Sequence, residues 1–147
     1  MLLARTTSLT MKKTILLVED SKVQKRAIEK ILHQADYLVL FGYDGEEALR
    51  LARECRPDLV LLDLLLPKIG GEEVLYSLKR DPHTEPIPVI VISHLTAGRS
   101  VDLKRNGAAD CLDKSEFLEG NEGDGALLKS IDRVLRDCER REVIRQC

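Results

Sequence analysis

The sequence lacks a hydrophobic run long enough to cross a membrane, and it lacks a clear excess of charge of either sign. A membrane-spanning helix needs about 20 apolar residues. The apolar stretch after Met11 stops at Glu19, which is also too short for a signal-peptide core. The 23 basic and 25 acidic residues give a net charge of −2. We therefore expect neither membrane insertion nor direct binding of nucleic acid.

Paired cysteines are also missing. The four cysteines, Cys55, Cys111, Cys138 and Cys147, form no Cys-x-x-Cys pair and have no histidine at a zinc-ligand spacing. We expect free thiols in a reducing cytoplasm. No arrangement of His with Ser or Cys points to a hydrolase triad. These absences argue against a zinc protein, a disulfide scaffold and a triad enzyme.

The chain is long enough for one domain with a substantial core. It has 147 residues, of which 44% are hydrophobic and 33% are charged, a composition typical of globular proteins. We expect residues 1–12 to be an N-terminal extension without ordered structure. Residues 13–147 are expected to form a single domain that ends in a long helix.

Apolar runs and helical repeats alternate along the domain. Short apolar runs predict buried strands over 14–18, 37–41, 58–63, 89–92 and 109–112. Apolar residues at helical spacing predict helices over 23–35, 45–54, 71–80, 96–106 and from 126 onward, the last for about 20 residues. Asp20 or Ser21 would cap the first helix and Asp44 the second, and a mobile loop is expected over 119–125. The alternation predicts a three-layer α/β sandwich around a parallel sheet.

Polar residues follow several of these apolar runs. Asp63 ends a strand that is otherwise apolar, and Glu19-Asp20 directly follows the first strand. Ser93 ends the fourth strand and Lys114 follows the fifth. An ionised group in apolar surroundings is costly unless a partner compensates it. Because the carboxyl ends of parallel strands share one edge of the sheet, we expect these side chains to meet there, where ligands bind.

The residue types at this edge favour phosphoryl chemistry. Three carboxylates within about 5 Å of one another repel by roughly 3 kcal/mol per pair at an effective dielectric constant of about 20. A hard divalent cation such as Mg²⁺ would relieve that repulsion. One carboxylate can then serve as a nucleophile that forms an aspartyl phosphate. A lysine and a hydroxyl would bind the transferred phosphoryl group.

The chain resembles a response-regulator receiver domain, the phosphoacceptor part of bacterial two-component signalling. The resemblance covers about Lys13 to Leu135. Ordered short motifs carry it along the whole domain: Val18-Glu19-Asp20-Ser21, Asp44-Gly45, Pro57-Asp58 through Asp63, Leu66-Pro67, Gly71, Pro88 through Ser93, Gly107-Ala108 and Asp113-Lys114. As an ordered set these motifs are a specific signal for the family.

The resemblance implies a fold and a metal site. The fold would be a doubly wound, five-stranded parallel sheet with the flavodoxin-like strand order 2-1-3-4-5. Mg²⁺ would be held directly by Asp20 and Asp63, and by Glu19 through a water molecule. The backbone carbonyl of Leu65 would be a further ligand.

The resemblance also implies the parts of a phosphoacceptor site. Asp63 would receive the phosphoryl group. Lys114 would pair with the phosphate, or with Asp63 before phosphorylation. Ser93 would hydrogen-bond the phosphoryl group and shift inward on activation.

Three residues depart from the family pattern: Ser115 replaces a frequent proline after the lysine, and the other two are candidate modulators. His94 follows the switch hydroxyl, where the family usually has a small residue. Its ring either narrows access to Asp63 or points away as an exposed side chain. Cys111 stands where the family commonly has an aromatic ring that turns inward on activation, so the usual relay to the output surface is in question.

The favoured function is a cytoplasmic, phosphorylation-dependent response regulator. A sensor histidine kinase or a phosphotransfer protein would donate the phosphoryl group, and a downstream protein target would respond. The expected contact face comprises the helix over 96–106, the strand over 109–112 and the last helix; a homodimer through this face is left open. Beyond self-phosphorylation and self-dephosphorylation, no enzyme activity is expected.

Two other functions fit parts of the sequence. The departures at His94 and Cys111 are compatible with a pseudo-receiver, a protein-binding module that depends little on phosphorylation. An aspartyl-phosphate hydrolase of the haloacid dehalogenase type would use the same nucleophile. That class needs a second aspartate two residues after it, where this chain has Leu65.

Overall fold

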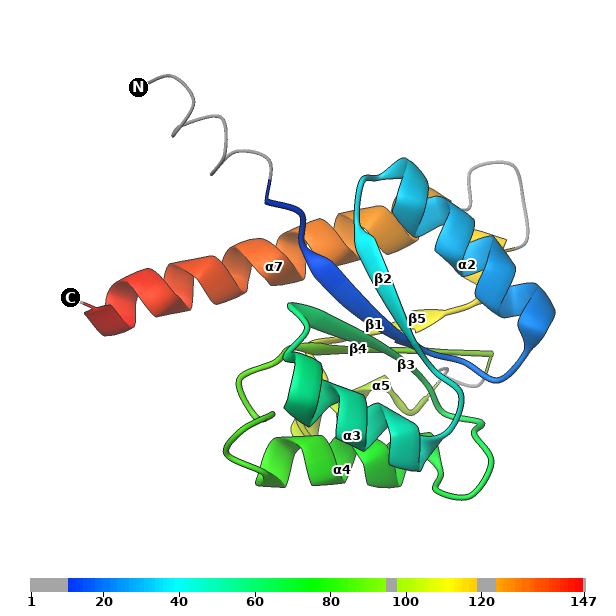
Figure 1. Ribbon diagram of the computed structural model, residues 1–147, viewed down its shortest axis with the longest axis horizontal. Coiled ribbons are helices and arrows are strands. Elements are labelled where there is room, and N and C mark those ends of the chain that lie inside the picture. Colours follow the sequence, from blue (N-terminus) through cyan, green and yellow to red (C-terminus); the bar gives the residue numbers. More distant parts are fainter. Residues whose placement is uncertain (1–10, 95–97, 119–123, 147) are drawn as a thin grey trace.

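The computed structural model describes residues 11–94, 98–118 and 124–146, which form one α/β layered domain (Figure 1). Five strands lie in its centre: β1 (Thr14–Val18), β2 (Leu38–Gly42), β3 (Leu59–Asp63), β4 (Val89–Ser93) and β5 (Asp110–Asp113). Six helices connect and cover them: α2 (Lys22–Gln34), α3 (Gly45–Cys55), α4 (Gly71–Arg80), α5 (Ser100–Arg105), α6 (Ser115–Leu118) and α7 (Asp124–Gln146).

The strands form one parallel sheet in the order β2-β1-β3-β4-β5. This confirms the predicted fold class and strand order. The register pairs Val18 of β1 with Leu62 of β3, and Asp63 with Ile92 of β4. The carboxyl ends of the strands are therefore level, so the segments that follow them emerge at one edge of the sheet.

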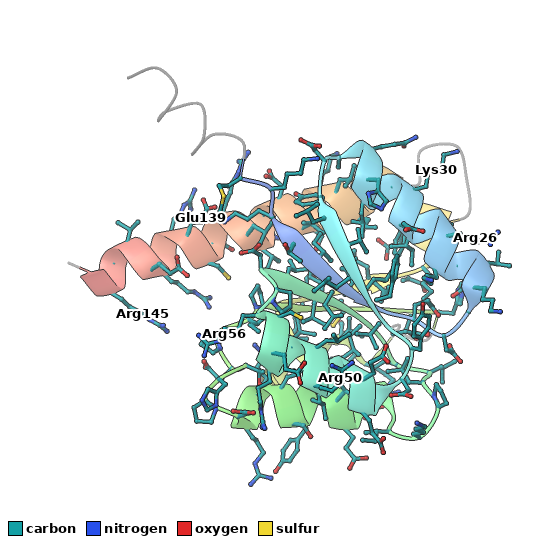
Figure 2. All side chains as sticks on the ribbon, viewed as in Figure 1. Arg26, Lys30, Arg50, Arg56, Glu139 and Arg145 are labelled. Carbon is teal, nitrogen blue, oxygen red and sulfur yellow. The ribbon has the colours of Figure 1, made fainter. Side chains whose placement is uncertain are left out.

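The sheet is covered on both faces, which explains why its strands are almost wholly apolar. Alternate side chains of each strand point to opposite faces. Leu16 and Val60 point to the face covered by α3, α4 and α5, whereas Ile15 and Leu61 point to the face covered by α2, α6 and α7. Figure 2 shows side chains filling the space between the sheet and the helices on both sides, while charged residues such as Arg26 lie at the periphery.

Side-chain caps fix where two of the helices begin. The Ser21 hydroxyl accepts a hydrogen bond from the Gln24 N–H at the start of α2, so Ser21 is the cap of that helix. Asp44 accepts from the Glu47 N–H at 2.8 Å at the start of α3. With Ser21 as the cap, the Asp20 side chain remains exposed at the sheet edge.

The structure corrects several predicted boundaries. Helix α5 begins at Ser100, later than the predicted 96, and residues 95–97 lie outside the described part of the chain. The single-turn helix α6 was not predicted, and its buried Phe117 packs into the core. Of the loop expected over 119–125, residues 119–123 lie outside the described residues and the last two belong to α7. Residues 1–10 of the expected extension also lie outside them.

The last helix is longer than the sheet needs. Helix α7 has 23 residues, which corresponds to about 35 Å. Its first half packs on the sheet through residues such as Leu127 and Ile131, whereas Val143 and Ile144 are 61% and 71% exposed. The C-terminal end of α7 projects beyond the layered domain (Figure 1).

The glycine pair at the start of α4 allows the chain to pass close to the end of β3. A methyl group added at Gly71 would lie 2.3 Å from the backbone oxygen of Asp63 and 2.5 Å from the Cα atom of Leu64. The Gly71 N–H also donates to the carbonyl oxygen of Leu64 at 2.9 Å. The first turn of α4 is therefore packed directly against the backbone that carries Asp63.

We predict that Gly71→Ala lowers the free energy of unfolding by about 1–3 kcal/mol, because the added methyl group overlaps backbone atoms that can move only together with the end of β3. Urea denaturation would measure the loss. Gly70→Ala is the matched control, since its added methyl group meets no atom within 4 Å and its φ of −66° suits alanine. Equal stability of the two variants would contradict this packing argument.

Candidate functional site

Three carboxylates gather at the carboxyl edge of the sheet. Glu19 and Asp20 follow β1, and Asp63 is the last residue of β3. One carboxylate oxygen from each lies within 4.8 Å of those from the other two. Glu19 and Asp63 are buried, with exposed fractions of 2% and 4%, whereas Asp20 is exposed. Sequence reasoning predicted this cluster, because Glu19-Asp20 and Asp63 end adjacent parallel strands.

The Lys114 ammonium group lies against two of these carboxylates. Its Nζ atom is 2.5 Å from Glu19 Oε1 and 3.2 Å from Asp63 Oδ2, and the lysine is only 2% exposed. A third oxygen, Oε1 of Gln24, lies 2.6 Å away. The ammonium has three N–H donors, and three oxygen atoms surround it. The positive charge therefore compensates two buried acids that would otherwise repel each other.

The backbone after β5 brings Lys114 to this position. The register pairs Ser93 of β4 with Asp113 of β5, and the Lys114 N–H donates to the Ser93 carbonyl oxygen at 3.0 Å. Ser93 itself is fully buried. Because Asp63 pairs with Ile92, the residue just before Ser93, the serine lies beside the end of β3. The structure therefore places the predicted hydroxyl and the predicted lysine at the same edge as Asp63.

Burial raises the pKa of the Glu19 carboxyl above its usual value. The hydrogen bond from Lys114 opposes this rise, whereas the neighbouring charge of Asp63 adds to it. The Ser21 backbone N–H donates to Glu19 Oε2 at 3.2 Å and also opposes the rise. Burial is the largest of these effects, so a proton competes for this carboxylate at a higher pH than it would in water.

The loop after Asp63 carries the predicted backbone ligand. The Leu65 N–H donates to Asp63 Oδ1 at 3.4 Å, which holds the loop close to the carboxylate. The Leu65 side chain is 61% exposed and takes no part in the acidic cluster. The role of its carbonyl oxygen as a metal ligand remains a prediction.

The two candidate modulators lie in different surroundings. His94 is exposed, and its Nε2 atom lies 3.4 Å from Nε2 of Gln24. Cys111 is partly buried, with its sulfur 4.0 Å from the carbonyl oxygen of Ser100 in α5. Burial raises the pKa of the Cys111 thiol, which keeps it in the neutral form. Their effects on phosphorylation and switching remain predictions.

Gln24 is the site residue that sequence reasoning missed. It lies in the first turn of α2, four residues after Asp20, and its side chain reaches back over the sheet edge to Lys114. Asp20 precedes the cap Ser21 and is not part of the helix, so helical spacing gave no signal for Gln24. Glutamine is also so common on exposed helix faces that the sequence alone did not single it out.

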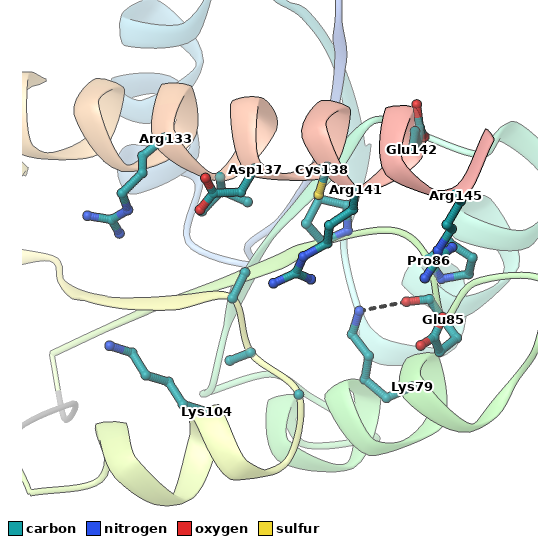
Figure 3. A pocket seen from close by; sticks show the side chains of 15 residues that line it. Lys79, Glu85, Pro86, Lys104, Arg133, Asp137, Cys138, Arg141, Glu142 and Arg145 are labelled. Atoms are coloured by element: carbon teal, nitrogen blue, oxygen red, sulfur yellow. Dashed lines mark hydrogen bonds between the residues drawn. The ribbon is translucent and has the colours of Figure 1, made fainter. Parts of the chain in front are cut away.

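A cavity of about 400 Å³ lies at the opposite edge of the sheet, between α7 and the chain segments that lead into β4 and β5 (Figure 3). Lys79 lies on one side, where its Nζ atom donates to the carbonyl oxygens of Glu85 and Ile87 at 2.9 and 2.7 Å. From α7, Arg141 extends into the cavity toward Lys79, and Asp137 also lines the cavity. The lining charges are mixed, and the cavity is remote from the carboxylate cluster.

The sequence as a whole matches a known family. A model of the response regulator receiver domain matches residues 15–119, from β1 to just beyond α6. This is more than half of the chain, and the sheet order and the acidic edge agree with it. The protein belongs to the response regulator receiver domain family.

Two bacterial relatives cover most of the chain. The polar-differentiation response regulator DivK of Brucella anthropi is 34% identical over 100 residues, which are 68% of this chain and 81% of DivK. The protein PilH of Pseudomonas aeruginosa is 34% identical over 124 residues, which are 82% of this chain and 96% of PilH. This chain is therefore similar to PilH over nearly the full length of PilH, and to DivK over most of the length of DivK.

Solved receiver domains have the same fold. The response regulator domain of Thermotoga maritima CheB superimposes with a TM-score of 0.75 at 27% identity, over 86% of this chain and 98% of that domain. The receiver domain of a sensor histidine kinase from Pseudomonas aeruginosa gives a TM-score of 0.74 at 25% identity, over 85% and 98%. That second structure has a magnesium ion coordinated in its active-site cleft.

The donor set of this chain suits such an ion. All three clustered side chains offer carboxylate oxygens, the ligand type that hard divalent cations prefer. Among the described residues, these three are the acidic, His or Cys side chains that lie close enough together to hold a metal ion.

No described helix is both long enough and apolar enough to span a bilayer.

We predict that Lys114→Met lowers the free energy of unfolding at neutral pH by about 3 kcal/mol, because it leaves two buried carboxylates without their counter-charge. The loss should shrink as the pH falls below neutral. Without the lysine, the pKa of Glu19 rises further, and its protonation removes the repulsion.

Urea denaturation at several pH values would test this prediction. Lys12→Met is the control, since Lys12 pairs at the surface with the exposed Asp36 and should cost less than about 1 kcal/mol. A Lys114→Met variant as stable as the Lys12 control would show that the ammonium is not needed to compensate the cluster.

Proposed function

We propose that this chain is a phosphorylation-controlled response regulator that accepts a phosphoryl group on Asp63. A histidine kinase or a phosphotransfer protein donates the group, and a protein target binds differently afterwards. The observation that carries the proposal is the buried Asp63 carboxylate beside the Lys114 ammonium, within the Glu19-Asp20-Asp63 cluster. A structural ion pair alone would not require three carboxylates at one edge.

The residues support a direct transfer of the phosphoryl group. One oxygen of ionised Asp63 forms a bond to phosphorus as the bond from phosphorus to the donor's histidine nitrogen breaks. The electron pair of that bond stays on the nitrogen, and an acyl phosphate results. Lys114 neutralises the negative phosphoryl oxygens and the Ser93 hydroxyl donates a hydrogen bond to one of them.

The acidic cluster would hold Mg²⁺ during this reaction. Glu19, Asp20 and Asp63 would hold the ion, with the Leu65 carbonyl as the remaining protein ligand. When bound, the ion supplies positive charge that offsets the repulsion between the carboxylates and the incoming phosphoryl oxygens.

The two alternative functions lack a supporting observation. A pseudo-receiver would not need the complete set of acids, hydroxyl and lysine that the structure brings together. A haloacid dehalogenase-type hydrolase needs an acid at position 65, and this chain presents an exposed leucine there. We propose that the chain has no separate enzymatic substrate and that its only chemistry is on itself.

We predict that phosphoramidate or acetyl phosphate with Mg²⁺ adds one phosphoryl group to the wild-type protein and none to Asp63→Asn. Intact-protein mass spectrometry would measure the addition. Asp58→Asn is the matched control: Asp58 lies just before the same strand at the opposite edge, where its carboxylate accepts from the Thr14 N–H. Labelling of Asp63→Asn at the wild-type level would refute the assignment of the acceptor.

We predict that Mg²⁺ affinity falls as the pH is lowered from 7 toward 5. The pKa of Glu19 is raised, so its carboxylate takes up a proton above the pH at which glutamate normally does. Glu19→Gln should bind Mg²⁺ about 10- to 100-fold more weakly at pH 7, with a flatter pH profile. Isothermal titration calorimetry would measure both. An unchanged affinity in Glu19→Gln would remove Glu19 from the metal site.

A further inference from the structure

Gln24 supplies the neutral oxygen among the three that surround the Lys114 ammonium. The other two belong to Glu19 and Asp63, and both carboxylates also take part in the proposed metal and phosphoryl chemistry. The Gln24 Oε1 atom is 2.6 Å from the lysine Nζ, a short hydrogen bond to a buried charge. It is therefore the acceptor around Lys114 that has no second role at the site.

The orientation of the Gln24 amide follows from its neighbours. An ammonium group only donates hydrogen bonds, so the amide oxygen faces Lys114 and the amide nitrogen faces away. That nitrogen lies 3.4 Å from Nε2 of His94. Because the amide nitrogen is a donor, this contact is a hydrogen bond in the tautomer of His94 whose Nε2 carries no proton. The His94 imidazole thus contacts the amide nitrogen, on the side of the amide that faces away from Lys114.

The backbone also fixes Gln24. Its N–H donates to the hydroxyl of Ser21, the cap of α2, so the residue belongs to a capped first turn. Ser21 in turn is joined to Glu19 through its own N–H. Gln24 is therefore held by the helix, by His94 and by Lys114.

We propose that Gln24 is a positioning residue: it holds the Lys114 ammonium beside Asp63, and His94 orients its amide. This inference rests on the proposed function. When Glu19 and Asp63 engage a cation or a phosphoryl group, Gln24 still offers Lys114 an oxygen. The lysine then stays directed at the acceptor carboxylate. His94, next to the switch residue Ser93, contributes to the site through this amide.

The test replaces Gln24 with methionine, which has a similar length and helix propensity but accepts no strong hydrogen bond. We expect Gln24→Met to slow phosphorylation by phosphoramidate at saturating Mg²⁺ about tenfold, since a displacement of about 1 Å at a reacting centre can cost up to about 100-fold. Gln34→Met is the matched control, at the exposed end of the same helix. It should react at the wild-type rate.

Two further readouts separate positioning from a general structural effect. In the Lys114→Met background, Gln24→Met should cause no additional slowing, because Gln24 acts through the lysine. In the metal-free protein, nuclear magnetic resonance should show two distinct signals for the Cε protons of Lys114. These should move closer together or merge in Gln24→Met, where the ammonium keeps Glu19 and Asp63 but loses its third acceptor, and separate again in Gln24→Glu, which restores an acceptor oxygen.

The outcomes distinguish this inference from the proposed function. If the wild-type protein accepts no phosphoryl group from phosphoramidate or a cognate kinase, the proposed function is wrong. If the wild-type protein reacts, two results would each overturn the role of Gln24. One is a Gln24→Met variant that is as fast as wild type with unchanged Lys114 signals. The other is slowing of equal size when Lys114 is already absent.

Discussion

The Lys114 ammonium, 2.5 Å from Glu19 and 3.2 Å from Asp63, is the interaction on which the rest of the site depends. Each of these three side chains is almost completely removed from water, so each would be costly to bury in its charged form alone. Together they compensate one another. The ion pairs also connect the ends of β1, β3 and β5, which are separate in sequence. The same three side chains therefore compensate the buried charges and link the ends of three strands.

The parallel sheet makes this arrangement possible without special loops. Because the strands run in one direction and end at one level, a charged residue at the end of any strand reaches the same edge. Local features then keep that edge open. Ser21, rather than Asp20, caps α2, and Asp20 therefore stays available. Gly71 lets α4 begin directly against the backbone of Asp63, and this contact fixes the end of β3.

The two edges of the sheet differ in their chemistry. At the carboxyl edge, acids from adjacent strands face one lysine, so the proposed binding of a cation or a phosphoryl group would change the net charge there. At the other edge, the cavity beside α7 is lined by acids and bases together, with Lys79 held by backbone carbonyl oxygens. Basic side chains outnumber acidic ones along this lining, and among its described residues no cluster of carboxylates faces a single lysine. This contrast supports the proposed phosphoryl chemistry at one edge and not at the other, although both edges are polar.

Much of the fold could be predicted from the sequence because the signals were local. Short apolar runs separated by helical repeats determine a parallel sheet, and acids at the ends of those runs determine which edge carries the site. The short helix α6 left no such signal, because one turn is too brief to show a repeat; its buried Phe117 becomes informative only when the core is in place. The predicted start of α5 was wrong for a similar reason, because this helix has only six residues and therefore shows little apolar repeat.

The sequence by itself determined which residues form the site, because their positions at the ends of strands set the edge at which they meet. These residues are Glu19, Asp20, Asp63, Ser93 and Lys114. What only the tertiary structure decided is which of them touch. The lysine lies closer to Glu19 than to Asp63, and a glutamine from the first helix completes its surroundings. Contacts of this kind depend on how a helix is docked on the sheet, and that docking arises from the packing of the whole core rather than from any short stretch of residues.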